Sequence, residues 1–205
     1  MPLRLFLCLA LLVAPACGAA VRVDPSPAPS ADPSAGLAVP AGPVLYEPEQ
    51  LIFPPEDFPL AGAEVARDAP IAARGWERQF ALNGSPDFRW FIVRVYVLEP
   101  DVPSAKFVSE NDCDSIAWPG EKPIVERIKA PPRSGDDARA CTYAFPDGQR
   151  VLYYVTGYRN VGIVVGTQPR RDEMTDGLAL DWITSLARRQ IAIIGGVLTR
   201  ASAGR

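Results

Sequence analysis

Alternation of apolar and polar residues predicts two long strands joined by a turn. In "GWERQFAL" every second residue from Trp76 to Leu82 falls on one face, a period of two that is typical of a half-buried strand. In "FRWFIVRVYVLE" positions 91, 93, 95 and 97 form an apolar face, and positions 90, 92, 94 and 96 form a mixed one. Asn83-Gly84 between these runs is a strong hairpin signal.

Further along, "ARACTYAFPDGQRVLYYVTGYRNVGIVVG" predicts a three-stranded meander. Asp147-Gly148 joins two β-rich runs, and residues 158–160 turn the chain into a third run at 161–165. A short strand is expected at 124–129. The segment 44–70 contains several prolines and no sustained period, so we expect an irregular lead-in with one turn at 55–58.

Two segments have helical spacing. Residues 101–117 predict a helix capped by Asp101 or Ser104, and residues 174–198 predict a second helix that Gly195-Gly196 frays or ends. The expected element order is β-β-α-β-β-β-β-α. Because hairpins join most of the strands, we predict an α+β fold in which two helices pack on one face of an antiparallel sheet.

The first twenty residues have the features of an export signal. Arg4 supplies a positive charge, and the apolar run at 5–13 is far shorter than the roughly 20 residues that span a bilayer. Two cleavage sites compete. Ala14-Pro15-Ala16 before Cys17 forms a lipobox, which implies a lipid anchor on Cys17, whereas residues 18–20 suit an ordinary signal peptidase. Both place the mature protein outside the cytoplasm, either anchored to the cell membrane or secreted.

The 205-residue chain has room for one domain and an appendage. With 1–20 as signal peptide, the Pro-, Ala- and Ser-rich segment 21–45 predicts an extended linker. We expect a single globular domain over 46–200 and a disordered tail over 201–205.

Cysteine use agrees with export. Cys113 and Cys141, 28 residues apart, predict one disulfide bond in an oxidising compartment. The alternative is a metal site or a reactive thiol. A chain without histidine offers few zinc ligands, so we expect no metal and no cofactor.

Charge and motifs exclude several function classes. The formal charge is -3 and the 21 basic residues are scattered, which gives no reason to expect a nucleic-acid partner. Without histidine, a Ser-His-Asp or Cys-His arrangement is excluded. Carboxylates remain, at 112, 114 and 121 and at Asp136-Asp137. A pair of them could bind calcium or perform acid/base chemistry, but neither spacing matches a calcium loop, and we interpret them as turn caps.

Aromatic residues are the second group that could contact a ligand. Trp90, Tyr96, Tyr153 and Tyr158 could fall together on the mixed sheet face and form a platform for a sugar, a peptide or a protein partner. The alternative is a second small core that the proline-rich lead-in covers.

Two short motifs resemble those of small exported bacterial domains of the lipoprotein and sensor type. The first is "GDDA" at 135–138, which leads into strands, and the second is the Arg159-Asn160 turn before a strand that begins at Val161. The resemblance covers roughly 47–199 and implies an extracytoplasmic α+β domain without an assigned activity. From the whole sequence we expect a non-catalytic envelope lipoprotein or secreted binding module. The alternatives are a structural subunit of an envelope complex, with an unknown envelope protein as partner, and a hydrolase that uses carboxylates alone.

Overall fold

The structure is a computed structural model that describes residues 46–72, 74–115, 122–170 and 176–203. The chain divides after Gly36, and all of the described residues belong to the second unit, Leu37–Arg205. The predicted signal, the linker over 21–45 and Cys17 lie outside them. Among the helices that are described, none has both the length and the apolar character of a membrane span.

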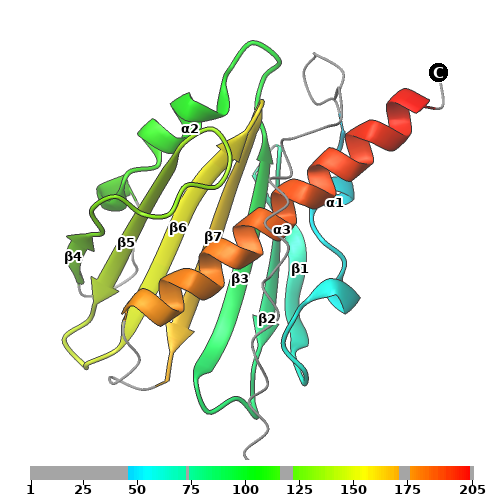
Figure 1. Ribbon diagram of the computed structural model, residues 1–205. Helices are drawn as coiled ribbons and strands as arrows, with labels where there is room; N and C mark the ends of the chain where they lie inside the picture. The colour runs from blue at the N-terminus through cyan, green and yellow to red at the C-terminus, as the bar shows by residue number, and fades with distance from the viewer. Residues whose placement is uncertain (1–45, 73, 116–121, 171–175, 204–205) are drawn as a thin grey trace, which may run out of the picture. The chain divides into compact units, whose positions relative to one another are not determined.

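Seven antiparallel strands of the described chain form one sheet, in the order β1-β2-β3-β7-β6-β5-β4 (Figure 1). Two meanders, β1 to β3 and β4 to β7, meet where β3 pairs with β7. The predicted antiparallel α+β class is therefore confirmed. The strands are β1 (Glu64–Ala72), β2 (Gly75–Ala81), β3 (Phe88–Val97), β4 (Ile124–Arg127), β5 (Ala138–Ala144), β6 (Arg150–Tyr158) and β7 (Val161–Pro169).

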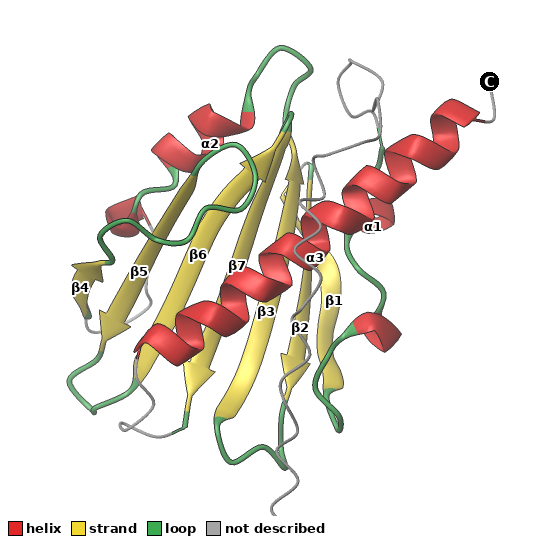
Figure 2. Ribbon diagram, viewed as in Figure 1, coloured by secondary structure: helices red, strands yellow, loops and turns green. Residues whose placement is uncertain are grey.

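Helices precede, interrupt and follow the strands (Figure 2). They are α1 (Pro48–Leu51), α2 (Ser104–Glu110) and α3 (Asp176–Ala203), with short 3-10 helices η1 (Pro55–Asp57) and η2 (Cys113–Ser115). The turn predicted at 55–58 is present as η1. The helix predicted over 101–117 is shorter, because the backbone of Asn111 leaves the helical region. Its N-cap is Pro103, without a side-chain cap, so neither Asp101 nor Ser104 has the predicted role.

The sheet is apolar on both faces. Alternation along β3 places Phe91 and Val93 in a first core with α1 and α3, and Ile92 in a second core with Phe107 of α2. The helices α2 and α3 therefore pack on opposite faces, and the prediction of two helices on one face is wrong. The reason is that the mixed face is apolar enough over β6 and β7 to require its own cover. Figure 1 shows α3 running diagonally across the first face.

The lead-in is more regular than predicted, because residues 64–72 form strand β1. Among the described residues this strand pairs with β2 alone, so Pro70 needs no partner on the outer side, and an edge strand tolerates proline. Before it, α1 and the residues that follow enter the first core. Gln190 of α3, fully buried, donates to the carbonyl of Leu51 (2.5 Å) and accepts from the amide of Phe53 (3.0 Å).

The C-terminal helix continues through Gly195-Gly196 to Ala203, so the prediction that it frays or ends at these glycines is wrong. Each glycine costs a helix about 1 kcal/mol relative to alanine. Ile191, Ile194 and Leu198 are buried in the first core on both sides of the pair, and this packing offsets that cost. The first three residues of the predicted disordered tail are therefore helical, while 204–205 lie outside the described residues.

Candidate functional site

Aromatic rings lie over strand glycines on the second face of the sheet. A Cβ atom on Gly75 would come 2.9 Å from the ring of Tyr96, and one on Gly166 would come 2.6 Å from the ring of Tyr153. Phe107 of α2 lies over Gly162 in the same way. Because glycine has no side chain, an aromatic ring can fill the space above the backbone. These rings build much of the second core.

We use the name aromatic face for the surface formed by Trp90, Tyr96 and Tyr153. The helices on this side of the sheet, α2 and η2, contact β4, β6 and β7. Trp90 and Tyr96 of β3 are half-buried, whereas Tyr153 is only 5% exposed. The surface open to a ligand is therefore supplied mainly by Trp90 and Tyr96.

The fourth predicted aromatic, Tyr158, lies elsewhere. Tyr158 lies four residues after Tyr154 on β6, so these two side chains are on the same face of the sheet, and Tyr153 is on the other. Tyr158 packs against the first core. The Arg159 guanidinium lies 5.7 Å from the centre of its ring. The lead-in packs into the first core, on the opposite face of the sheet. It therefore does not cover the aromatic face, whereas the alternative prediction was a second small core covered by the lead-in.

Charged groups border the aromatic face. The Glu77 carboxylate, whose side chain is 4% exposed, pairs with Arg67 (3.1 Å) and with Arg94 (2.8 Å). Burial raises the pKa values of Tyr96 and Tyr153, although the positive charge of Arg94 acts in the opposite direction. Both tyrosines therefore present neutral hydroxyls beside fixed charges.

A chain of amide hydrogen bonds leads away from Trp90. Its indole N–H donates to Gln168 Oε1 (2.8 Å), and Gln168 Nε2 donates to Gln149 Oε1 (2.6 Å). Gln149 Nε2 in turn donates to Asp147 (2.6 Å) in the β5–β6 hairpin. The orientation of the Trp90 ring is thus fixed from strand β7 and the β5–β6 turn.

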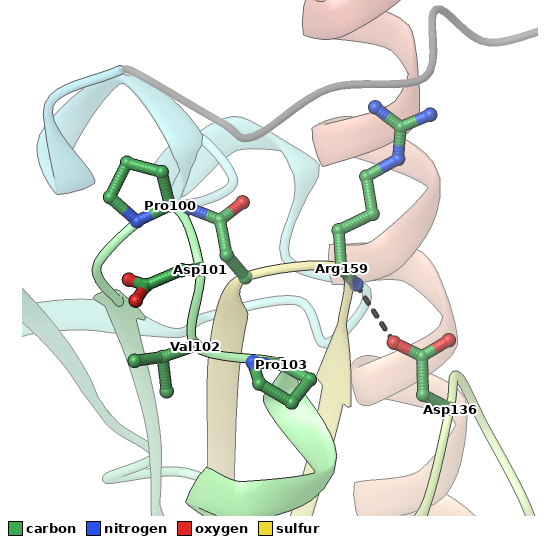
Figure 3. A pocket seen from close by; sticks show the side chains of 7 residues that line it. Pro100, Asp101, Val102, Pro103, Asp136 and Arg159 are labelled. Atoms are coloured by element: carbon green, nitrogen blue, oxygen red, sulfur yellow. Dashed lines mark hydrogen bonds between the residues drawn. The ribbon is translucent and has the colours of Figure 1, made fainter.

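A pocket of about 560 Å³ lies at the other end of these strands (Figure 3). It is formed by the loop before α2, the loop before β5 and the β6–β7 turn. Its lining residues are Pro100, Asp101, Val102, Pro103, Asp136, Arg159 and Asn160.

The two motifs that resemble exported bacterial domains meet at this pocket. Asp136 Oδ2 accepts from the hydroxyl of Ser104 (2.7 Å) and from the backbone N–H of Arg159 (2.8 Å). The Asp136 amide donates to the carbonyl of Gly157 (2.9 Å). In Figure 3 the Asp101 side chain points away from Asp136, and the Arg159 guanidinium extends away from both carboxylates. Asp136 therefore holds a loop, a turn and α2 together.

The other carboxylates noted in the sequence form ion pairs. Asp112 pairs with Arg127 (3.1 Å) and Arg139 (3.3 Å), and Asp114 also pairs with Arg127. Hydrogen bonding from Arg127 lowers the pKa of Asp112. Glu121 lies outside the described residues. Within the described chain, no three Cys, Asp or Glu side chains are arranged to hold a metal ion.

Cys113 and Cys141 form the predicted disulfide bond, with a Cα–Cα distance of 5.7 Å. It links η2 to β5 beside the second core. The Tyr143 hydroxyl donates to the carbonyl of Cys113 (2.7 Å), and this hydrogen bond is a second link between η2 and β5.

No protein-family model matches this chain, no curated protein matches it, and no solved structure matches it. Inference about its function therefore depends on its own residues.

Sequence reasoning did not find Glu77, Gln149 or Gln168 as neighbours of the aromatic face. The alternation did place Glu77 opposite Trp76 and Arg78, on the mixed side of β2. The signal that was available is cross-strand pairing, since Glu77 faces Arg94 in the β2–β3 register. The order of the strands was needed to bring Gln149 and Gln168 to Trp90.

Proposed function

We propose that this chain is a non-catalytic binding module of a bacterial cell envelope, exported by its N-terminal signal and anchored to the membrane through lipid on Cys17. The signal, the cysteine and the proline-rich linker support this location. The disulfide bond is compatible with it, since such bonds persist in oxidising compartments. The resemblance of the 135–138 loop and the 159–161 turn to exported bacterial domains supports the same location.

The observation that carries the binding role is the aromatic face. Trp90 and Tyr96 are half-buried rings. Gln168 orients the Trp90 indole, Phe107 packs against the Tyr96 ring, and the Glu77–Arg94 pair supplies charged groups beside them. Aromatic side chains with adjacent hydrogen-bonding groups are favoured at binding surfaces, because they bury a large area at a low entropy cost. Flat rings beside charged groups suit the pyranose rings of envelope polysaccharides.

Cosedimentation of the Cys17→Ser chain with purified peptidoglycan sacculi tests this proposal. We expect the parent protein to be retained, Trp90→Ala and Tyr96→Ala to lower the retained fraction at least about fivefold, and Trp90→Phe to retain most of the binding. Tyr158→Ala is the matched control, because it removes the same kind of ring from the opposite face. Absence of retention, or equal loss in Tyr158→Ala, would contradict the proposal.

A second candidate is a structural subunit of an envelope complex. Ile124 on strand β4 is 70% exposed, and the outer edge of β4 has no partner strand among the described residues. An exposed apolar residue on such an edge favours contact with another chain. Analytical ultracentrifugation of the Cys17→Ser chain would show self-association that Ile124→Lys abolishes. The carboxylate-only hydrolase has less support, since Asp136 already accepts two hydrogen bonds.

A further inference from the structure

A second pocket lies at the end of the sheet where β3 begins and β7 ends. Its volume is about 240 Å³. Figure 1 shows that the β5–β6 hairpin, the start of β3 and the end of β7 lie together at this end. Three guanidinium groups line the pocket, together with one carboxylate and two side-chain amides: Arg89, Arg150, Arg170, Asp147, Gln149 and Gln168. We call it the arginine pocket.

A β-bulge brings Arg89 to the arginine pocket. Phe88 pairs with Pro169 and Trp90 pairs with Gln168, so Arg89 is the extra residue between two consecutive partners on β7. Bulges re-aim side chains and occur often beside functional sites. In the described part of the chain, the Arg89 guanidinium has neither an ion pair nor a hydrogen bond. Its backbone carbonyl accepts from the Leu82 amide (3.0 Å).

The remaining groups of the pocket are held in place by the fold. Arg170 donates from Nε to the carbonyl of Phe88 and from Nη2 to the carbonyl of Leu82, both at 3.0 Å. The Asp147 carboxylate accepts from the amide (3.0 Å) and the side chain (2.6 Å) of Gln149. The one carboxylate among the lining residues is therefore engaged in the hairpin turn. Arg150 pairs with Glu126 (3.9 Å), whereas Arg89 and Arg170 have no carboxylate partner among the described residues, so the lining keeps an excess of positive charge.

We infer that the arginine pocket binds a single anionic group, a carboxylate or a phosphate. Guanidinium groups match the planar geometry of a carboxylate and the oxygens of a phosphate, often with two hydrogen bonds. The volume is below the roughly 300 Å³ at which pockets begin to enclose whole small ligands, so it suits one group of a larger molecule.

The neighbouring Trp90 suggests what the rest of that molecule is. Gln168, only 7% exposed, both lines the pocket and accepts from the Trp90 indole. A sugar ring against Trp90 could therefore carry its acid group into the pocket, which points to an acidic saccharide. This extension rests on the proposed function, whereas binding of the anionic group does not.

Titration of the ¹⁵N-labelled full chain, with Cys17→Ser, tests the inference by nuclear magnetic resonance. Inorganic phosphate and sodium acetate are added in separate titrations at constant ionic strength, so the two sources of the anion are told apart. We expect saturable shifts of the Trp90 indole and Gln168 side-chain signals with at least one of them. Arg89→Ala should raise the dissociation constant about tenfold, and Arg89→Lys should raise it less, because lysine keeps the charge but not the planar fork.

Arg189→Ala is the matched control, since this exposed arginine lies on α3 outside the pocket. Shifts that stay linear with both anions, or an equal effect of Arg89→Ala and Arg189→Ala, would overturn the inference. Failure of sacculus binding alongside saturable anion binding would remove the proposed function and leave this site intact. Sacculus binding without anion binding would do the reverse.

Discussion

Glu77 is a charged residue on a strand whose side chain is almost completely removed from solvent. Its carboxylate is 4% exposed and lies between Arg67 and Arg94, which come from the two strands that flank β2. A buried charge is tolerated only when it is paired, and Glu77 has two cationic partners. The Glu77–Arg94 ion pair forms the charged border of the aromatic face. Unfolding experiments measure what this ion pair contributes to stability, without any ligand.

We expect Glu77→Ala to lower the free energy of unfolding by about 3 to 5 kcal/mol, because it leaves Arg94 half-buried without its carboxylate. Urea unfolding at pH 7 measures this change. Glu99→Ala is the control, since the Glu99–Arg74 pair has side chains 66% and 40% exposed and should contribute less than about 1 kcal/mol. A similar loss of unfolding free energy in both variants would show that the buried Glu77 ion pairs stabilise the fold no more than the exposed Glu99–Arg74 pair does.

Asp68 predicts a pH dependence. Burial alone would raise the pKa of Asp68, but hydrogen bonds from Arg78 (2.6 Å) and Trp76 (2.5 Å) outweigh it and hold the pKa below its ordinary value of 3.8. A lowered pKa in the folded state stabilises the fold above 3.8, and this contribution is lost as the pH falls through and below that value.

The measurement is the difference in unfolding free energy between the parent and Asp68→Asn from pH 7 to pH 3. We expect the difference to shrink at the acid end, where Asp68 takes up a proton. Asp57→Asn is the matched control, because it removes one carboxylate from an exposed position outside this hydrogen-bond cluster, and it should not reproduce the effect of Asp68→Asn. A difference that stays constant down to pH 3 would contradict this assignment.

Among the elements, the hairpins were the most predictable from sequence. Asp147-Gly148 and the turn at 158–160 lie where alternation and turn residues placed them, and Gly148 has the positive φ (82°) that a tight turn requires. β1 was not predicted, because an exposed edge strand has little apolar alternation and tolerates Pro70. The helices were assigned to one face because alternation does not tell which of two apolar faces a helix covers.

Part of the aromatic face was predictable from the sequence, and part was not. Alternation along β3 correctly grouped Trp90 with Tyr96, and the Tyr153 ring joins them from β6. The strand order β3-β7-β6 could not be read from local patterns, so Gln149 and Gln168 were not connected with Trp90. Sites built across strands that are distant in sequence depend on this order.

Gly162 of β7 gives a prediction about how α2 packs on the sheet. Gly162→Ala would push its methyl group into the ring of Phe107, which packs α2 on the second face. We expect a loss of about 1 to 3 kcal/mol in unfolding free energy, since overpacking forces side chains from their preferred positions. A Cβ at Gly84 meets nothing within 4 Å, so Gly84→Ala should change stability by less than about 0.5 kcal/mol. Equal effects in thermal or urea unfolding would count against this packing.

At the scale of the whole molecule, the disulfide bond closes the connection between the two meanders. It joins η2, which follows α2, to β5 across 28 residues. By loop entropy we expect Cys113→Ala/Cys141→Ala to lower the free energy of unfolding by about 3 to 4 kcal/mol. Urea unfolding of this double variant and of the parent, both carrying Cys17→Ser, provides the measurement. An unchanged midpoint would mean that other contacts already restrain this connection.

We propose that the domain works outside the cytoplasm, held at a membrane by its N-terminus. The intact mass of the mature protein, expressed in bacteria and extracted from their membranes, distinguishes a lipid anchor from a secreted chain. We predict a chain that begins at Cys17 and carries a diacylglyceryl adduct, and we predict that Cys17→Ala loses both the adduct and membrane association. A mature chain that begins at Val21 without lipid would contradict the anchor and leave a secreted protein.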